Sequence, residues 1–152
     1  VNKHFVIPWT KRTGNSVSLL MNPQKALHSQ LMISHAWLEC AEEVYECLQL
    51  LCEKTNVNFD TELFFCTLSI YQPNDDAPDG MSLAEQVSLN PFKKVIAGLP
   101  SQGMAVLHTS RADIYSRMWC VHEVDEALES GIAVRGIMSS LYEAAFRGQA
   151  SD

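Results

Sequence analysis

Four short apolar runs, separated by longer segments with helical spacing, constrain the fold of this chain more than any other feature. The first run, Leu31–Ser34, stops at polar residues, which is typical of a strand buried on both faces. The others are Leu63–Tyr71, Gly103–Thr109 and Ile132–Met138, each rich in apolar, aromatic or β-branched residues. Strands that alternate with helices in this way predict an α/β fold, with a parallel sheet covered by helices on both faces.

The segment Glu39–Lys54 has the spacing of an amphipathic helix. Its apolar face contains Val44, Leu48 and Leu51. The polar residues expected opposite or beside that face are Glu42, Glu43, Glu46 and Gln49.

Three more helices are predicted after the second strand. Ser82–Leu99 begins with the spacing of a capping box, and Pro91 is expected to break or kink it. Ser116–Ser130 is followed by Gly131, a favoured residue just beyond a helix end. Ser140–Arg147 starts a last helix. We divide the chain into an N-terminal extension, residues 1–29, interrupted by prolines, and an α/β domain, residues 30–152.

Composition and charge exclude several functions. The chain of 152 residues is 47% hydrophobic and 19% charged, as expected of one globular domain. Its formal net charge of -7 argues against nucleic acid as the main partner, because binding to the phosphate backbone needs a basic face. No run of about 18 apolar residues is present, so no membrane partner is expected. No GxGxxG or Walker-type loop occurs, which disfavours a Rossmann redox enzyme or a nucleoside-triphosphate site.

The cysteines indicate a reducing compartment, so we expect a cytoplasmic protein. Their number, five, is odd, and no CxxC pair occurs. Most lie in apolar stretches, where a free thiol behaves as a small hydrophobic side chain. Zinc binding and nucleophilic catalysis remain the alternatives to this structural role.

Polar residues follow the expected strands, and in a parallel sheet these strand ends meet at one edge, where ligands bind. After the first three strands the polar residues are Ser34, His35, Trp37 and Glu39, then Gln72, Asn74, Asp75 and Asp76, then Thr109, Ser110, Arg111 and Asp113.

The helix Ser116–Ser130 carries the candidate for a chemical role, Glu123. On a helical wheel, the arc expected to face the sheet is Cys120, Val121, Val124, Ala127 and Leu128. Glu123 falls at the margin of this arc, one turn after Trp119. A carboxylate at the edge of a core is partly desolvated, which raises its pKa and suits acid–base or cation-stabilising work. A solvated or ion-paired surface residue is the alternative interpretation.

The segment SRMWCVHEVDEALESG resembles the third-helix motif of TIR domains, whose plant members have a serine, then Trp-Cys, then a glutamate four residues after the tryptophan. Here these positions are Ser116, Trp119, Cys120 and Glu123. LMISHAW is similar to the first TIR strand, YQPNDDAPDG takes the place of the loop after the second, and GMAVLHTSRADIYS that of the third strand and its exit. The resemblance covers Gln30–Met138.

The resemblance implies a flavodoxin-like sheet in strand order 2-1-3-4. It also implies that Glu123 is the catalytic residue of an NAD⁺ glycohydrolase in signalling or innate immune defence. Such an enzyme cleaves the nicotinamide–ribose bond and gives nicotinamide and ADP-ribose or a cyclic form. NAD⁺ is then a substrate, no cofactor or metal is expected, and self-association through TIR-type contacts is implied. The residues expected to bind substrate are Ser34, His35, Ala36, Trp37, Tyr71, Gln72, Ser116 and Trp119.

The chain departs from the TIR pattern in two places. Plant TIR domains have an arginine and a glycine soon after the first-strand serine, where this chain has His35-Ala36-Trp37; Arg111 or Arg117 would have to substitute. No segment matches the fifth TIR strand, so we expect either a shortened domain or replacement by residues 1–29. A non-catalytic TIR-like interaction module therefore remains an alternative function. A flavodoxin-like nucleoside deoxyribosyl transferase, which also uses a carboxylate, is a third.

Overall fold

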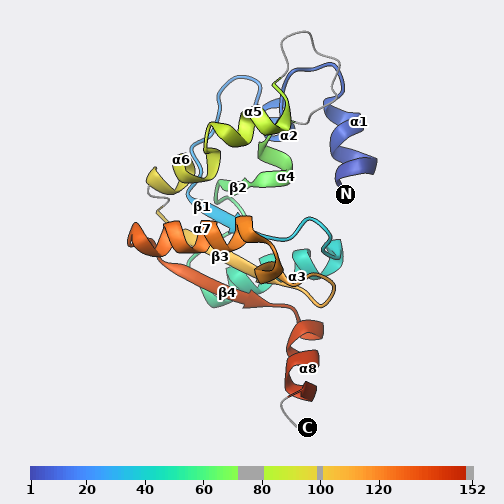
Figure 1. Ribbon diagram of the computed structural model, residues 1–152, viewed down its shortest axis with the longest axis vertical. Helices are drawn as coiled ribbons and strands as arrows, with labels where there is room; N and C mark the ends of the chain where they lie inside the picture. Colours follow the sequence, from blue (N-terminus) through green and yellow to red (C-terminus); the bar gives the residue numbers. More distant parts are fainter. Residues whose placement is uncertain (72–80, 99–100, 150–152) are drawn as a thin grey trace.

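The fold is a flavodoxin-like α/β domain with a four-stranded, all-parallel sheet. The computed structural model describes residues 1–71, 81–98 and 101–149. The strands are β1 (Leu31–Ser34), β2 (Leu63–Phe65), β3 (Gly103–His108) and β4 (Val134–Met138), in the order β2-β1-β3-β4 (Figure 1). The sequence-based prediction of fold class and strand order is therefore confirmed.

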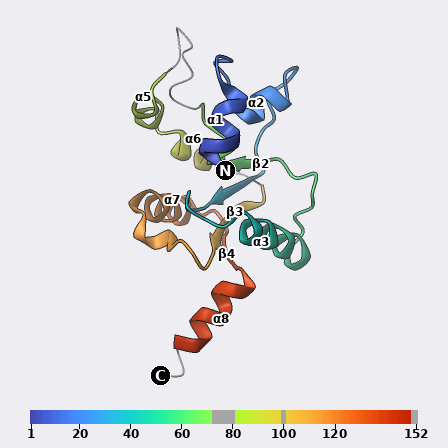
Figure 2. The same ribbon diagram turned by 90° about the vertical axis from the view of Figure 1, so that its right-hand side faces the viewer.

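The sheet separates two apolar layers because successive side chains of a strand point to opposite faces. Leu31 and Ile33 of β1 belong to one layer, together with Cys47 and Leu51 of α3 (Ala41–Lys54). Met32 belongs to the other layer, with residues of α6 (Pro91–Ala97) and α7 (Met118–Glu129). Figure 2 shows α3 and α7 on opposite sides of the sheet. This alternation fixes the face to which each residue at a strand end is directed.

The predicted helix over Ser82–Leu99 is two helices, α5 (Leu83–Ser88) and α6, with the break where Pro91 predicted it. Ser82 and Glu85 form a complete capping box at the start of α5. Asn90 has φ 54°, a left-handed conformation at the break between the two helices, and Pro91 then starts α6. Local side-chain chemistry therefore sets both helix starts.

The predicted second strand, Leu63–Tyr71, is wrong beyond Phe65. β2 is an edge strand with β1 as its neighbour, and the chain turns at Cys66 into the short helix α4 (Cys66–Ser69). The side chain of Ser69 accepts a hydrogen bond from the backbone N–H of Phe65 at 3.3 Å, which closes this turn. The turn brings Cys66 and Thr67 back towards the exit of β1.

Residues 1–29 form short elements beside β2 and α4. They are η1 (Asn2–Val6), α1 (Ile7–Thr10) and α2 (Val17–Met21), none longer than 5 residues. Val6 and Thr10 are buried, and the hydroxyl of Thr10 donates to the carbonyl of Val6 at 2.9 Å. Ser18 donates to the carbonyl of Leu68 at 3.1 Å, which ties α2 to α4.

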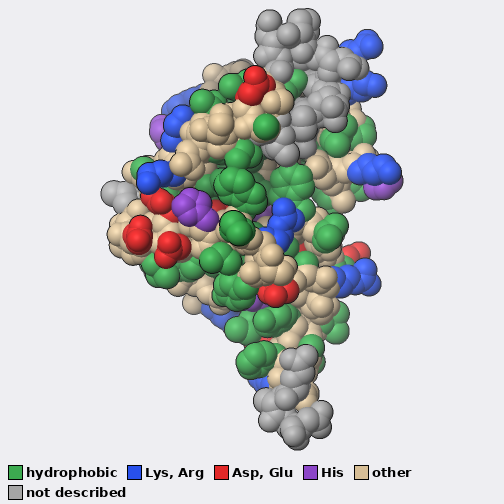
Figure 3. All heavy atoms as spheres, viewed as in Figure 1, with side chains coloured by type: hydrophobic (Ala, Val, Ile, Leu, Met, Phe, Trp, Pro, Cys, Tyr) green, Lys and Arg blue, Asp and Glu red, His purple; other side chains and the backbone are tan. Residues whose placement is uncertain are grey.

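Two elements complete the chain, η2 (Ile114–Ser116) before α7 and α8 (Ser140–Gln149) after β4. In Figures 1 and 2, α8 projects away from the sheet. Across the described residues, no helix combines the length and apolar character that a membrane span requires. Figure 3 shows apolar side chains exposed between charged ones on one face of the molecule.

Candidate functional site

The candidate site lies where β1 and β3 end side by side. The helix after β1 (α3) covers one face of the sheet and the helix after β3 (α7) covers the other, so the chain connections diverge here. Flavodoxin-like proteins bind ligands at this divergence, beyond the carboxyl ends of the strands. Ser34 is the last residue of β1, and its side chain points to the α7 side.

Ser34 and Glu123 meet at this edge, although 89 positions separate them in the chain. The hydroxyl of Ser34 donates to a carboxylate oxygen of Glu123 at 2.6 Å. One turn earlier on α7, the thiol of Cys120 donates to the carbonyl of His35 at 3.6 Å. These two contacts hold α7 over the exit of β1.

Glu123 is buried, with 6% of its surface exposed. The helical wheel was therefore right that Cys120 and Ala127 face the sheet, but wrong about Val121 and Leu128. Val121 and Leu128 are 43% and 60% exposed, whereas Cys120, Glu123 and Ala127 are the buried residues. The buried face of α7 thus includes the carboxylate of Glu123, whose contact on β1 is Ser34.

Burial raises the pKa of Glu123 above its ordinary value of 4.5. Removal from water penalises the charged carboxylate, and this effect outweighs the contacts that favour the charge. Those contacts are the hydrogen bond from Ser34 and the positive fields of His35, Arg117 and His122. The folded chain thus holds a carboxylate whose negative charge is incompletely compensated.

Arg117 supplies a positive charge beside this carboxylate. It precedes α7, and its guanidinium lies 5.8 Å from the centre of the Trp37 ring, a cation–π contact. Trp37 is 38% exposed, so the pair borders the open side of the β1 exit. Arg117 therefore occupies the region in which the sequence lacks the expected arginine.

Two other predicted site residues of the α7 region are directed elsewhere. The hydroxyl of Ser116 donates to the carbonyl of Asp113 at 2.7 Å, within η2 and its N-cap. Trp119 is half exposed, and its ring lies against Phe92 of α6, with ring centres 6.5 Å apart. The structure thus brings Ser34 to Glu123 directly and places these two residues at the periphery.

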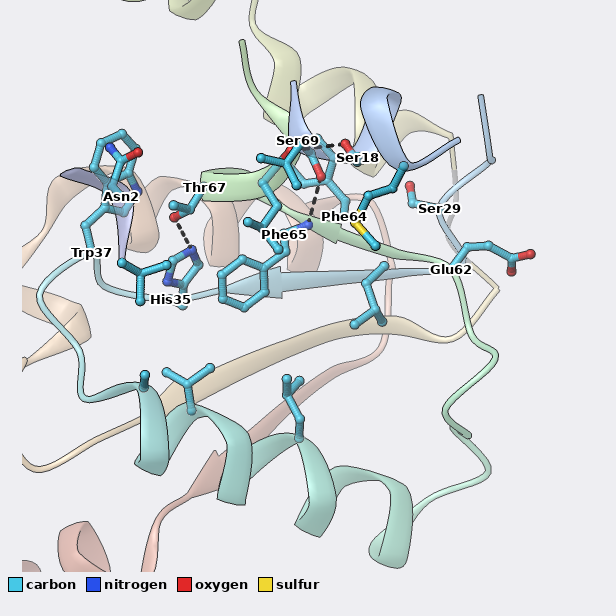
Figure 4. Close-up of a pocket in the computed structure, with 18 of the residues that line it drawn as sticks. Asn2, Ser18, Ser29, His35, Trp37, Glu62, Phe64, Phe65, Thr67 and Ser69 are labelled. Atoms are coloured by element: carbon cyan, nitrogen blue, oxygen red, sulfur yellow. Dashed lines mark hydrogen bonds between the residues drawn. The ribbon is translucent and has the colours of Figure 1, made fainter. Parts of the chain in front are cut away.

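The remaining predicted residues lie on the β2 side. The carbonyl of Tyr71 accepts a hydrogen bond from the side chain of Gln86 at 2.8 Å. Gln72 lies outside the described residues. His35, Ala36 and Trp37 follow Ser34 and line a cavity of about 1050 Å³ between the N-terminal elements, α3 and β2 (Figure 4). Glu123 does not line this cavity.

Sequence reasoning missed a second buried carboxylate, Glu43, which it placed opposite or beside the apolar face of α3. Glu43 is 3% exposed and accepts three hydrogen bonds: from Ser110 N–H at 2.7 Å, Ser110 Oγ at 2.7 Å and Ser139 Oγ at 2.5 Å. The helical spacing of Glu43, Cys47 and Leu51, each four residues from the next, is the signal that could have found it.

The three donors shift the pKa of Glu43 in the direction opposite to that of Glu123. Burial again acts to raise the pKa of Glu43, but the hydrogen bonds from Ser139 and Ser110 and the field of Arg111 outweigh it and lower the pKa. Glu43 ties α3 to the ends of β3 and β4. Its charge is satisfied by the fold, so it stabilises the sheet edge.

Within the described ranges, no group of three or more histidine, cysteine, aspartate or glutamate residues is arranged to hold a metal ion. The acidic residues Asp75, Asp76 and Asp79 lie outside those ranges. Comparison of the chain with models of known protein families, with curated proteins and with solved structures finds no match in any of the three.

Proposed function

We propose that this protein is a TIR-like NAD⁺ glycohydrolase that releases nicotinamide and ADP-ribose or its cyclic form in cytoplasmic signalling or defence. Glu123 is the catalytic residue. The observation that carries this proposal is the position of its carboxylate: it is buried, held by one hydroxyl at 2.6 Å, and lies at the ligand-binding edge of a flavodoxin-like sheet. This residue also lies in the motif that resembles the TIR third helix.

Cleavage of the nicotinamide–ribose bond develops positive charge on the ribose, and an anion held nearby stabilises that charge. Glu123 is suited to this role because the fold leaves its charge undercompensated, with Ser34 as the hydroxyl that orients it. A ribosyl cation would supply the missing positive partner. Nicotinamide leaves as a neutral group and water attacks the ribose, so a single carboxylate is sufficient.

The residues around the β1 exit have the chemistry to bind the rest of the dinucleotide. The guanidinium of Arg117 can pair with phosphate, and the half-exposed ring of Trp37 offers a flat apolar surface. The field of Arg117 also reaches Glu123. We assign substrate binding to Arg117 and Trp37, with Ser34 as the positioning residue.

A non-catalytic interaction module is the second candidate, favoured by a specific observation. Glu123 is 6% exposed and closed over by Ser34, so substrate needs this contact to open. Apolar side chains also face solvent on the loop after β1 and at the start of α7: Leu38 is 83% and Met118 85% exposed. Such residues suit contact with another protein surface, and self-association that opens the site would reconcile both candidates.

The test is nicotinamide release from NAD⁺, followed by chromatography, with concentrated protein and a crowding agent to promote assembly. Glu123→Gln is compared with the wild type and with Asp125→Asn, a matched removal of an exposed carboxylate on the same helix. We expect a loss of at least about a hundredfold for Glu123→Gln and an unchanged rate for Asp125→Asn.

The outcomes separate the candidate functions. Equal release by the wild type and Glu123→Gln would refute the catalytic role of this residue. No release from either, with self-association shown by light scattering, would leave the interaction module. Exchange of the base on a nucleoside without NAD⁺ cleavage would point to a deoxyribosyl transferase.

A further inference from the structure

Cys66, at the start of α4, is surrounded by polar groups that a buried structural thiol does not need. Its sulfur lies 3.1 Å from His35 Nε2 and accepts a hydrogen bond from the indole N–H of Trp37 at 3.3 Å. The hydroxyl of Thr67 lies 4.0 Å from the sulfur. The sulfur of Cys66 is therefore enclosed by side chains that can form hydrogen bonds with it.

His35 is held in one orientation by its other contacts. Its Nδ1 lies 3.3 Å from a carboxylate oxygen of Glu39, and its ring stacks on Phe65 with ring centres 4.1 Å apart (Figure 4). The second oxygen of Glu39 accepts the backbone N–H of Ala36 at 2.7 Å, which fixes the carboxylate. Thiol, imidazole and carboxylate therefore form a chain of contacts, the arrangement that activates a nucleophile.

The electrostatics of His35 agree with this geometry. Burial lowers its pKa, but the contacts with Cys66 and Glu39 outweigh burial and raise the pKa to about 9. The ionisable groups that face it are Cys66 from α4, Glu39 from the loop after β1, and Glu123 from α7. The imidazole is therefore protonated at neutral pH and can donate a proton to a leaving group.

Cys66 does not itself line the cavity of about 1050 Å³ beside β2, but it lies directly behind residues that do. His35, Trp37 and Thr67 line this cavity, and all three contact Cys66. Cys66 itself is 7% exposed, which admits small reactants and disfavours bulky ones. A hydroperoxide is small enough, and its reaction with a thiolate needs a proton donor for the oxygen that leaves.

We propose that Cys66 is a redox-active cysteine that reacts with hydroperoxides, with His35 as the proton donor and Glu39 as its positioning residue. The sulfur attacks one peroxide oxygen, the S–O bond forms and the O–O bond breaks. The leaving oxygen takes the Nε2 proton of His35 and departs as water when the reactant is hydrogen peroxide. Sulfur is oxidised by two electrons to the sulfenic acid, peroxide is reduced, and an added thiol restores the cysteine.

The other cysteines of the chain serve as controls for the reactivity of Cys66. Cys40 is more exposed than Cys66, but its thiol donates to the carboxylate of Glu42 at 2.8 Å, a partner that does not stabilise negative charge on sulfur. Burial raises the pKa of Cys47 to about 12 and that of Cys120 to about 11. Peroxide reactivity at Cys66 therefore cannot be attributed to exposure.

The experiment treats the whole folded protein with stoichiometric hydrogen peroxide at pH 7 for timed intervals and removes the peroxide with catalase. It then unfolds the protein in a dimedone-type reagent that traps sulfenic acid, and quantifies each cysteine by mass spectrometry. We expect Cys66 to be labelled at least about tenfold faster than the more exposed Cys40. Labelling of Cys66 is expected to fall as the pH rises through about 9, where His35 loses its proton. Labelling of Cys66 no faster than Cys40 would overturn the proposal.

Two variants test the roles of the partners. His35→Gln is expected to lower the labelling rate of Cys66 at least about tenfold, and Glu39→Gln to lower it and to shift the fall to a lower pH. His28→Gln, which removes an exposed histidine, is the matched control and should leave the rate unchanged. If His35→Gln fails to fold, the comparison of Cys66 with Cys40 in the wild type decides the question alone. A folded His35→Gln with the rate and pH profile of the wild type would refute the role of His35.

Discussion

Replacing Glu43 with glutamine is expected to destabilise the folded chain, although the substitution preserves shape. The carboxylate of Glu43 accepts hydrogen bonds from the backbone and hydroxyl of Ser110 and from the hydroxyl of Ser139. These bonds join α3 to the ends of β3 and β4 across 67 and 96 positions of the chain. Glutamine keeps one acceptor oxygen and puts an NH₂ group in place of the other.

The size of the effect follows from the three bonds. A hydrogen bond to a charged group contributes about 1.5–3 kcal/mol and one between neutral groups about 0.5–1.5 kcal/mol, so each weakens by roughly 1 kcal/mol when the charge is removed. Burying a neutral amide costs less than burying a carboxylate, which returns part of this loss. We expect a net loss of about 2 kcal/mol, which lowers the Tm by about 4–8 °C for a domain of this size.

The pH dependence of folding stability tests the role of Glu43 independently. The pKa of Glu43 in the folded chain is lowered below its ordinary value of 4.5, so the folded state binds fewer protons here than the unfolded state. The stabilisation by Glu43 is therefore complete above pH 4.5 and is lost as the pH falls through the folded pKa. The difference between wild type and Glu43→Gln should be largest at neutral pH and shrink in acid.

Urea unfolding followed by circular dichroism at pH 7 and at several pH values below 4.5 measures both effects. Glu42→Gln is the matched control, since Glu42 is the adjacent, exposed residue of α3, and it should change the unfolding midpoint far less. A Glu43→Gln variant within about 0.5 kcal/mol of wild type at pH 7 would refute the assigned strength of the cluster. A stability difference between wild type and Glu43→Gln that grows in acid would refute the lowered pKa of Glu43.

Two further predictions concern the sheet edge and the candidate carboxylate. Gly103→Ala should cost at least about 3 kcal/mol in urea unfolding, because the residue has φ 80° and a Cβ there would lie 2.3 Å from the carbonyl oxygen of Ala133. Gly131→Ala, also at positive φ (71°) but with no atom within 4 Å, should cost only about 1 kcal/mol. Glu123→Gln should be more stable than the wild type at pH 7. The raised pKa of Glu123 means that the wild type loses stability as the pH rises from 4.5 through the folded pKa. Urea unfolding at pH 7 and pH 4 should show that the difference in stability between variant and wild type becomes smaller in acid.

The parts of the fold that follow from local pattern could be predicted from the sequence. β1 begins and ends where its apolar run does, and the break between α5 and α6 lies at Pro91. The end of β2 could not be predicted, because Cys66–Ser69 is as apolar and β-branched as a strand. What turns it into α4 is the hydrogen bond from Phe65 N–H to Ser69 and its packing on α2, both set by tertiary structure.

The candidate site was predictable as a location, but its contacts were not. The ends of parallel strands meet at one edge, so polar residues after β1 and β3 were expected together. A helical wheel fixes only relative angles, and the rotation of α7 that buries Glu123 depends on Ser34 of β1. In the same way, the contact of His35 with Cys66 spans 31 positions and needs the turn into α4, which the sequence did not predict.

Glu43 and Glu123 are both buried near the β1 and β3 exits, and their opposite pKa shifts indicate different roles. Glu43 has three donors, so its charge is satisfied and its ionisation stabilises the fold. Glu123 has one, so its ionisation works against the fold at neutral pH. A group that costs stability and remains undercompensated is suited to a positive ligand, whose binding would return that cost. NAD⁺ carries its positive charge at the bond that the proposed reaction breaks, so Glu123, rather than Glu43, is the carboxylate expected to act on it.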